Sequence, residues 1–509
     1  MSTKFLVKWL MALVGLALLI GVCGSEAPLT WAAVNSLPGN DMACYRNLAE
    51  IESRLTELVN LYPSLAEKID IGNSWEKDHL VGGGAGSDIL VLKLTNQSLM
   101  GNKPKLFVVS GLDARDIMGA EINLRFAERL LSGYDSNANT RMTLDFSEVH
   151  LLIVANPDGR AYLENQFAES RENSQDLPTY QEAWGRNRNT AGCPVSELIG
   201  VDLSRNFPVG FMPNSDACWD DYPGAEAKSE PETEAIADYM QSLYGMERTD
   251  LNSLIPETTP GMVINLTEWA KTNKIYHAYH HTVDDHENNQ ALASRLAFKL
   301  AHSQDAVETI EIKQPADAPD SRYGNLIDTS YGLSGVSSFE FQLKRFLFPS
   351  QFTPCTYFEG SFADSWSEVL VLAARAAARP YEFGQGPEIM SIESNLIGTL
   401  GQLWSASGAV DSQFGVQSVP SIPPDPTGVF YSLRTPAWWS GGTAVEATYI
   451  PNSQNPRFGT FNASFNFPEL GPDQSLVFFQ SVNQDGKRGI PCAVSIYRRY
   501  YLLLPVVQR

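Results

Sequence analysis

Four short stretches of the chain hold the side chains best suited to chemistry. Asp113 and Asp116 are carboxylates, a residue type that can bind metal ions, and residues 275–281 contain three histidines, the commonest metal ligands. Arg205 carries a planar fork of donors that suits a carboxylate. Gln342 is a neutral amide and cannot accept a proton near neutral pH. The chemistry of the chain therefore depends on whether such groups meet at one site and activate water there.

The elements that must position these residues alternate between helical and strand-like patterns. Apolar residues recur at helical spacing over residues 45–61, and a second helix is expected at 121–131. Strand-like apolar runs cover residues 89–94, 105–111 and 149–155. This alternation predicts an α/β fold with a mixed sheet flanked by helices, in which chemistry gathers in loops beyond the strand ends.

The C-terminal third has a different pattern. A long helix expected at residues 364–378 closes the α/β region, and short alternating runs separated by Gly, Pro, Asn and Asp follow. They predict a small all-β, immunoglobulin-like sandwich. We therefore expect a leader at residues 1–33, an α/β domain at 40–385 and an accessory sandwich at 390–509. The runs cover residues 429–434, 444–450, 460–465, 476–482 and 492–504.

Composition and the N-terminus limit the partners and the compartment. The 509 residues carry a formal net charge of −22, which argues against nucleic acid or an anionic membrane surface as partner. Lys4 and Lys8 precede the apolar run 10–22, which is typical of a secretory signal peptide. An uncleaved anchor over residues 5–22 and a lipoprotein box at residues 20–23 are the alternatives. The protein is expected to be secreted or extracytoplasmic, with membrane contact only through such an anchor.

Export permits disulfides, so the six cysteines need partners. Cys193 and Cys218 flank one loop and are the best candidate pair. Cys44, Cys355 and Cys492 leave an odd count if Cys23 is removed with a leader. For these three, buried unpaired thiols are at least as well supported as disulfides.

Several strings resemble those of the zinc carboxypeptidase A-type family, in family order from about residue 44 to residue 381. The C-terminal strings at residues 435–439 and 481–486 are similar, more loosely, to the sandwich appended to secreted bacterial relatives. The matching strings in the α/β region are Gly111-Leu112-Asp113-Ala114-Arg115-Asp116, Asn156-Pro157-Asp158-Gly159, residues 200–207, Tyr222-Pro223-Gly224, residues 229–233, and Ser338-Phe339-Glu340-Phe341-Gln342-Leu343 with Asp328 and Tyr331 before it.

The resemblance implies a metal site with altered ligands. In the family, a His and a Glu from one motif and a later His hold zinc, which lowers the pKa of a bound water. These positions map to Asp113, Asp116 and His280 here. His277 would face the other side of a regular strand over 273–279. Two carboxylates in place of an imidazole–carboxylate pair imply that Zn²⁺ binds weakly or is absent, or that a harder cation is preferred.

The general base implied by the resemblance is also altered. Gln342 stands at the position of the catalytic glutamate. Loss of a general base costs about a hundred- to ten-thousand-fold in rate. Glu340 points to the same face of a regular strand, but one step along a strand is roughly 7 Å, too far for it to replace the base without rearrangement.

Substrate binding is partly retained in this resemblance. Arg205 corresponds to the arginine that pairs with the terminal carboxylate of the substrate, and Ser204 replaces its usual asparagine partner. Arg115 stands in its family position. Gly185 occupies the place of the oxyanion-stabilising arginine, with Arg186 one residue late, and Tyr323 is an approximate stand-in for the mobile family tyrosine.

Two functions follow as hypotheses. In the first, the chain is a secreted, hydrolytically impaired member of the family, a pseudoenzyme that binds peptide C-termini or similar small carboxylates. In the second, it is an active metallocarboxypeptidase with an unusual Asp-Asp-His site. The simultaneous departures at residues 113, 116, 185, 204 and 342 favour the first.

Overall fold

The computed structural model describes most of the chain between residues 42 and 498. The described residues are 20–21, 42–80, 86–173, 175–190, 192–193, 195, 199–214, 216–246, 248–251, 253–278, 287–302, 310–313, 323–346, 351–394, 397–398, 403–412, 424–466 and 474–498. The chain divides into two compact units, one formed by residues 27–385 with 415–420, the other by residues 1–26, 386–414 and 421–509. The expected leader lies almost entirely outside the described residues.

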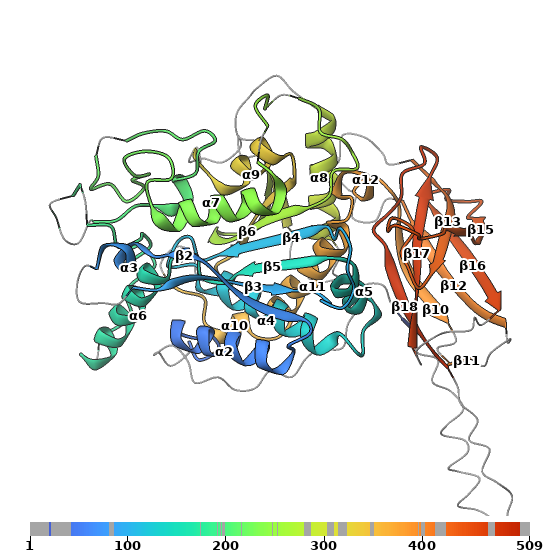
Figure 1. Cartoon of the computed structure of the whole chain (residues 1–509), viewed down its shortest axis with the longest axis horizontal. Coiled ribbons are helices and arrows are strands. Elements are labelled where there is room, and N and C mark those ends of the chain that lie inside the picture. Colours follow the sequence, from blue (N-terminus) through green and yellow to red (C-terminus); the bar gives the residue numbers. More distant parts are fainter. Residues whose placement is uncertain are drawn as a thin grey trace, which may run out of the picture. The chain divides into compact units, whose positions relative to one another are not determined.

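The first unit contains an eight-stranded mixed sheet, which confirms the predicted fold class. Its strand order is β2-β3-β5-β4-β6-β9-β7-β8, and β2 to β6 are labelled in Figure 1. The strands are β2 (Ala66–Asn73), β3 (Asp88–Leu94), β4 (Lys105–Ser110), β5 (Glu148–Leu152), β6 (Met262–Ala270), β7 (Asn273–His277), β8 (Ile310–Lys313) and β9 (Ser337–Lys344).

The central strands of this sheet share one direction. β5, β4, β6 and β9 are parallel neighbours, whereas β7 pairs antiparallel with β9. The carboxyl ends of the four parallel strands therefore meet at one edge of the sheet, where loops can form a binding site. β7 starts at that edge, where Lys274 pairs with Gln342, and ends away from it, where His277 pairs with Phe339.

Helices cover both faces of the sheet (Figure 1). Side chains of β4 and of helices α7 and α9 share one hydrophobic cluster, and α4 contacts β4, β5 and β6. None of the described helices is long and apolar enough to cross a bilayer. The helices are α2 (Leu48–Leu61), α3 (Trp75–His79), α4 (Ile117–Gly133), α5 (Ala138–Phe146), α6 (Pro157–Glu172), the 3₁₀ turn η2 (Leu203–Arg205), α7 (Pro231–Tyr244), α8 (Glu287–Ala301), α9 (Leu326–Ser334), α10 (Cys355–Phe358), α11 (Ser361–Ala376) and α12 (Pro380–Phe383).

Two disulfides join segments of this unit. The predicted pair Cys193–Cys218 is confirmed. Cys44 is bonded to Cys355, 311 residues away, so the expectation of unpaired thiols is wrong for these two cysteines. The physical reason is tertiary: the chain before α2 lies against the segment that starts α10, and Tyr45 there donates its hydroxyl to the Thr353 carbonyl.

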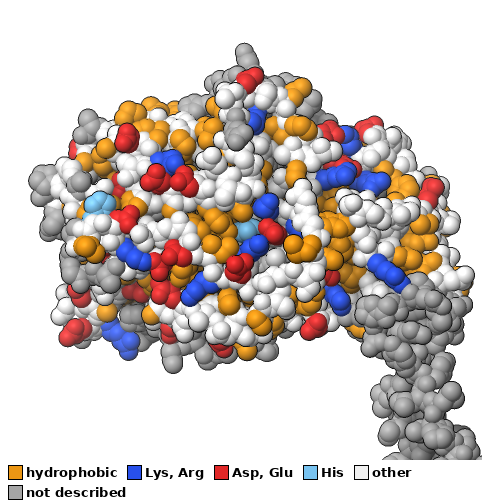
Figure 2. Space-filling model, in the orientation of Figure 1, with side chains coloured by type: hydrophobic (Ala, Val, Ile, Leu, Met, Phe, Trp, Pro, Cys, Tyr) orange, Lys and Arg blue, Asp and Glu red, His pale blue; other side chains and the backbone are white. Residues whose placement is uncertain are grey.

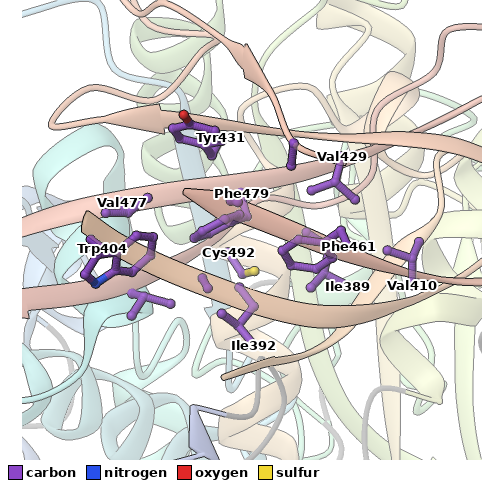
Figure 3. Close-up of a cluster of buried hydrophobic side chains, with 14 of the residues drawn as sticks. Ile389, Ile392, Trp404, Val410, Val429, Tyr431, Phe461, Val477, Phe479 and Cys492 are labelled. Carbon is purple, nitrogen blue, oxygen red and sulfur yellow. The ribbon is translucent and has the colours of Figure 1, made fainter. Parts of the chain in front are cut away.

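The second unit has two sheets with a shared apolar core. The strand orders are β1-β10-β12-β16-β15 and β11-β18-β17-β13-β14. Trp404, Phe461 and Phe479 are fully buried in the core between them (Figure 3). The strands are β1 (Ile20–Gly21), β10 (Glu388–Ser394), β11 (Ile397–Gly398), β12 (Leu403–Asp411), β13 (Pro426–Leu433), β14 (Val445–Glu446), β15 (Thr448–Pro451), β16 (Phe458–Asn466), β17 (Gln474–Asn483) and β18 (Cys492–Arg498).

Candidate functional site

A cavity of about 230 Å³ lies at the carboxyl ends of the parallel strands. It brings together six of the ten candidate residues from the sequence: Asp113, Arg115, Asp116, Ser204, Arg205 and Glu340. Its other lining residues are Leu112, Tyr180, Gln181, Asp202, Asp220, Asp221, Thr267 and Asn325. We call the part built on η2 and the loop after Cys218 the anchor side, and the part built on the ends of β4, β6 and β9 the reaction side.

On the reaction side, Asp113 is bound by an arginine. Both carboxylate oxygens of Asp113 accept hydrogen bonds from Arg115, from Nε at 2.9 and 3.1 Å and from Nη2 at 2.7 Å. The pKa of the Arg115 guanidinium is raised well above its ordinary value. Burial acts to lower this pKa, but the charge of Asp113 outweighs the effect of burial. A two-pronged, charge-assisted pair of this kind is among the stronger side-chain interactions. Asp113 is therefore already neutralised by a cation of the protein itself.

Gly185 makes this pair possible. A Cβ atom on Gly185 would lie 2.5 Å from Arg115 Nε and 2.6 Å from its Cζ, closer than real Cβ contacts. The backbone holds the two segments together, since the Ala114 amide donates to the Gly185 carbonyl at 2.8 Å. The absence of a side chain at Gly185 therefore leaves the space that the Arg115 guanidinium occupies. The departures at Asp113 and Gly185, separate in the sequence, are two parts of one arrangement.

Asp116 is hydrogen-bonded to a side chain of the cavity lining and to a backbone amide of β6. Its Oδ1 accepts hydrogen bonds from the Tyr180 hydroxyl at 3.0 Å and from the Glu268 amide at 3.1 Å. Burial, and then the neighbouring charges of Asp113 and Glu268, raise the pKa of Asp116 well above its ordinary value. A metal at Asp116 would have to compete with these hydrogen bonds and displace any proton on the carboxyl, because ligands must be deprotonated.

Glu268 is a fully buried carboxyl that the sequence analysis missed. Its Oε1 accepts hydrogen bonds from the Met118 and Gly119 amides in the first turn of α4. It thus acts as the acceptor for the helix N-terminus, while the N-cap residue Asp116 makes no side-chain cap bond. Burial raises the pKa of Glu268 to about 8.

Two cationic side chains lie close to Tyr180. The Cζ atom of Arg345 lies 3.5 Å from the centre of the Tyr180 ring, and that of Arg115 lies 4.9 Å from it. Arg345 is buried, and burial lowers its pKa. Carboxyl groups on the reaction side are therefore accompanied by internal cations and by the Tyr180 hydroxyl.

The end of β9 places Gln342 behind Glu340. The Gln342 Nε2 atom donates to Glu340 Oε1 at 3.0 Å, and the Thr267 hydroxyl also donates to that oxygen at 3.4 Å. Glu340 lines the cavity, and Gln342 does not. The two side chains share a face, as the strand period predicted, and their contact fixes the amide of Gln342 as a donor. Neither atom of that contact is available to take a proton from water while the bond persists.

The third candidate metal ligand, His280, lies outside the described residues. The strand that precedes it, β7, runs antiparallel to β9 and ends beside Phe339, away from the cavity edge. The strand that ends at the cavity beside β4 is β6, and its side chain there is Thr267. The signal that could have revealed Thr267 is the mainly apolar run 262–266, interrupted only by Asn265, which directly precedes Thr267.

The contacts of Asp113, Asp116 and Thr267 determine how well these residues could act as zinc ligands. Asp113 is bound to Arg115, the Oδ1 atom of Asp116 accepts two hydrogen bonds, and Thr267 offers only a neutral hydroxyl. Within the described part of the chain, no three His, Cys, Asp or Glu side chains are grouped so as to hold a metal ion. Among the described lining residues, the candidate ligands Asp113 and Asp116 are thus both engaged by groups of the protein itself.

On the anchor side, Arg205 lines the cavity from η2. Its Nε donates to Asp202 Oδ2 at 3.1 Å, and its Nη2 lies 3.9 Å from Asp221 Oδ2. Ser204 donates its amide and its hydroxyl to the other oxygen of Asp202. Burial raises the pKa of Asp202, although Arg205 opposes the shift. Asp202 therefore orients the guanidinium, whose side chain remains 20% exposed toward the cavity.

The remaining two candidates lie beside the cavity rather than in its lining. Arg186 is buried, with Nη1 donating to the Trp219 carbonyl at 3.2 Å and Nε 3.8 Å from Asp220 Oδ1. Tyr323 is half-buried in the turn before α9. Neither is among the lining residues. Asp202, Asp220 and Asp221 were not predicted from the sequence, although all three lie in or beside the strings that resemble the family.

Comparisons with known proteins place residues 51–357 in one family, described as "Zinc carboxypeptidase". The chain is 24% identical to rat carboxypeptidase A1 over 354 residues, 67% of this chain and 72% of that protein. It is 30% identical to human carboxypeptidase A1 over 203 residues, 39% of this chain and 42% of that protein.

Two solved structures share the fold. Thrombin activatable fibrinolysis inhibitor has a TM-score of 0.52 at 20% identity, over 66% of this chain and 74% of that one. Carboxypeptidase A from Helicoverpa armigera has a TM-score of 0.51 at 20% identity, over 67% of this chain and 76% of that one.

Proposed function

The chain belongs to the zinc carboxypeptidase family, and from that premise we propose that it is an exported, hydrolytically impaired member that binds peptide C-termini or similar small carboxylates. Zinc is the metal that the family implies. In this proposal the chain binds zinc weakly or not at all. The alternative is an active enzyme with metal ligands Asp113, Asp116 and His280.

The observation that carries the proposal is the pairing of Asp113 with Arg115. A metal at Asp113 would have to displace a guanidinium that holds both carboxylate oxygens, and the displaced cation would remain close to the metal. Gln342 adds a second obstacle, because its amide donates to Glu340 and cannot act as a base. Binding and catalysis are thus separated: the residues that would orient a ligand are present, and the residue that would activate water is not.

Arg205 is the group that supports binding. A guanidinium oriented by a buried acid presents its donors in a fixed plane, which favours a carboxylate over a spherical anion. We therefore assign the terminal carboxylate of the ligand to Arg205 and leave proton transfer out of the function.

Other observations support the partners and the compartment in this proposal. Basic and acidic side chains are interspersed over the face shown in Figure 2, as is typical of a protein that does not bind nucleic acid. The disulfides Cys44–Cys355 and Cys193–Cys218 favour an oxidising, extracytoplasmic compartment. Secretion after cleavage of a signal peptide is the form that we propose, with a lipoprotein or membrane anchor as the alternative.

The test is incubation of the purified protein with a mixed pool of peptides, with added zinc in one arm and a chelator in another, followed by mass spectrometry. We expect no loss of C-terminal residues in any arm, and little zinc by metal analysis. Chelator-sensitive trimming, or tightly bound stoichiometric zinc, would establish the active alternative instead. The Arg115→Ala variant sharpens the metal arm, because removal of the guanidinium should increase zinc uptake if Arg115 is what occupies Asp113.

A further inference from the structure

The rim of the cavity carries acidic groups that the proposed function does not use. Asp220 and Asp221 line the cavity, and their side chains are 74% and 50% exposed. Trp219 precedes them in the chain; it is not among the lining residues and is 61% exposed, an unusual position for so large an apolar side chain. These three consecutive residues, the rim triplet, lie directly after Cys218.

The rim triplet is held in place by its backbone. Cys218 is tied to Cys193, and the Trp219 carbonyl accepts hydrogen bonds from Arg186 Nη1 at 3.2 Å and from the Tyr222 amide at 3.1 Å. The Asp202 amide, next to the anchor, donates to the Tyr222 carbonyl at 2.8 Å. The rim and the anchor are therefore joined by backbone hydrogen bonds and a disulfide, so the backbone that carries the exposed side chains is placed in advance of binding.

The charges along the cavity do not balance. Besides Asp116, whose pKa is raised, the acidic lining residues are Asp113, Asp202, Asp220, Asp221 and Glu340, against the lining cations Arg115 and Arg205 and the neighbouring Arg186. Asp113 and Asp202 are hydrogen-bonded to the two arginines. Asp220 and Asp221 lie 3.8 to 3.9 Å from Arg115, Arg186 and Arg205, beyond hydrogen-bond distance. A ligand that brings only a carboxylate adds to this excess of negative charge.

We propose that the rim triplet selects ligands with a basic residue immediately before the C-terminal residue. The inference rests on the proposed function, because Arg205 takes the terminal carboxylate. The chain of the ligand then leads outward to the rim, at about 3.3 to 3.6 Å per extended residue. A lysine or arginine side chain there pairs with Asp220 and Asp221, and its cationic head lies over the Trp219 indole. The cation offsets the acidic lining that would otherwise oppose the carboxylate.

The test uses fluorescently labelled peptides that differ only in the penultimate residue: lysine, glutamine or glutamate, each as the free acid and as the amide. Binding to the full chain is measured by anisotropy with a chelator present, and repeated with calcium. We expect free-acid affinity in the order lysine, glutamine, glutamate, with the lysine preference declining as salt is raised. Asp220→Asn and Asp221→Asn should each reduce the preference about two- to fivefold, and Trp219→Ala by a similar factor.

The matched control is Glu226→Gln, which removes an exposed acid that does not line the cavity. It should leave the preference unchanged. Equal binding of the lysine and glutamate free acids, or a lysine preference that survives the double Asp220→Asn, Asp221→Asn change, would overturn the inference and leave the proposed function standing. If no free acid binds better than its amide, the proposed function fails first. Abolition of the lysine preference by calcium alone would assign the rim to a metal ion and overturn the inference.

Discussion

The anchor side of the cavity and its reaction side hold their charged groups in different ways. On the anchor side, Asp202 orients Arg205 through one nitrogen, and the guanidinium still faces the cavity. On the reaction side, Arg115 binds both oxygens of Asp113, and Asp116 is bonded to Tyr180 and to the Glu268 amide. One frame therefore combines a side directed toward a ligand with a side whose groups are bonded to one another. Under the proposed function, this difference separates recognition, on the anchor side, from reacting groups that have become part of the interior.

The largest expected effect concerns Glu268, the carboxyl beneath the reaction side. Its pKa of about 8 in the folded chain lies above the value near 4.5 expected when the chain unfolds. The group is protonated in the folded chain and ionises on unfolding, so its contribution to stability is complete below about pH 4.5 and is lost as the pH rises through 8. We expect the free energy of unfolding to fall by up to about 1.4 kcal/mol per pH unit across this window.

The measurement is denaturant unfolding of the wild type and of Glu268→Gln between pH 5 and pH 8. Glutamine keeps an oxygen acceptor for the Met118 and Gly119 amides and has no proton to lose, so this variant should show a shallower decline. Glu226→Gln, an exposed change, should follow the wild type. Parallel curves for wild type and Glu268→Gln would show that Glu268 is already ionised in the folded protein.

The next largest effect is expected when the anchor side loses Arg205. Replacing Arg205 with alanine removes the charge-assisted hydrogen bonds to a terminal carboxylate, worth about 1.5 to 3 kcal/mol. Free-acid peptides should bind about 10- to 100-fold more weakly to Arg205→Ala, and amidated peptides should be unaffected. Calorimetric titration with matched free-acid and amidated peptides measures the two affinities. The exposed Arg171→Ala, outside the cavity, is the control, and equal losses for acids and amides would remove the anchoring role.

Local sequence patterns predicted most of the frame and only part of the site. The apolar runs before Gly111 and Asn156 correspond to β4 and β5, and the helical spacing over 45–61 corresponds to α2. The direction of β7 was not predictable, because an isolated strand pattern does not say whether its neighbour runs parallel or antiparallel. That direction decides which side chains reach the cavity edge: β7 ends away from it, whereas β6 contributes Thr267 to the lining.

The contacts within the site were the least predictable part. The motif comparison located Asp113, Arg115 and Gly185, but their steric and ionic coupling depends on an approach of two loops. Glu268 shows the same limit: a glutamate near the end of a strand is expected to be solvated unless the helix N-terminus whose amides donate to it is known to pack against it. The Cys44–Cys355 bridge likewise depends on a tertiary approach across 311 residues.

The smallest expected effect sharpens the reaction side. Gln342→Glu restores a carboxylate where the family has its base, yet it places that group against Glu340, whose Oε1 now accepts from the Gln342 amide at 3.0 Å. Two carboxylates at this distance cannot both ionise, so one is expected to hold a proton. With Asp113 still bound to Arg115, the variant should gain no peptide hydrolysis and should lose about 1 kcal/mol of stability with the lost hydrogen bond. The same peptide-pool assay measures the hydrolysis, and a melting curve measures the stability.

Chelator-sensitive hydrolysis by this single variant would mean that a metal already occupies the site and that only the base is missing. If hydrolysis appeared only when Arg115→Ala was added to Gln342→Glu, the obstacle to metal binding would lie in the Arg115–Asp113 pair. That pair would then account for the difference between the two sides of the cavity.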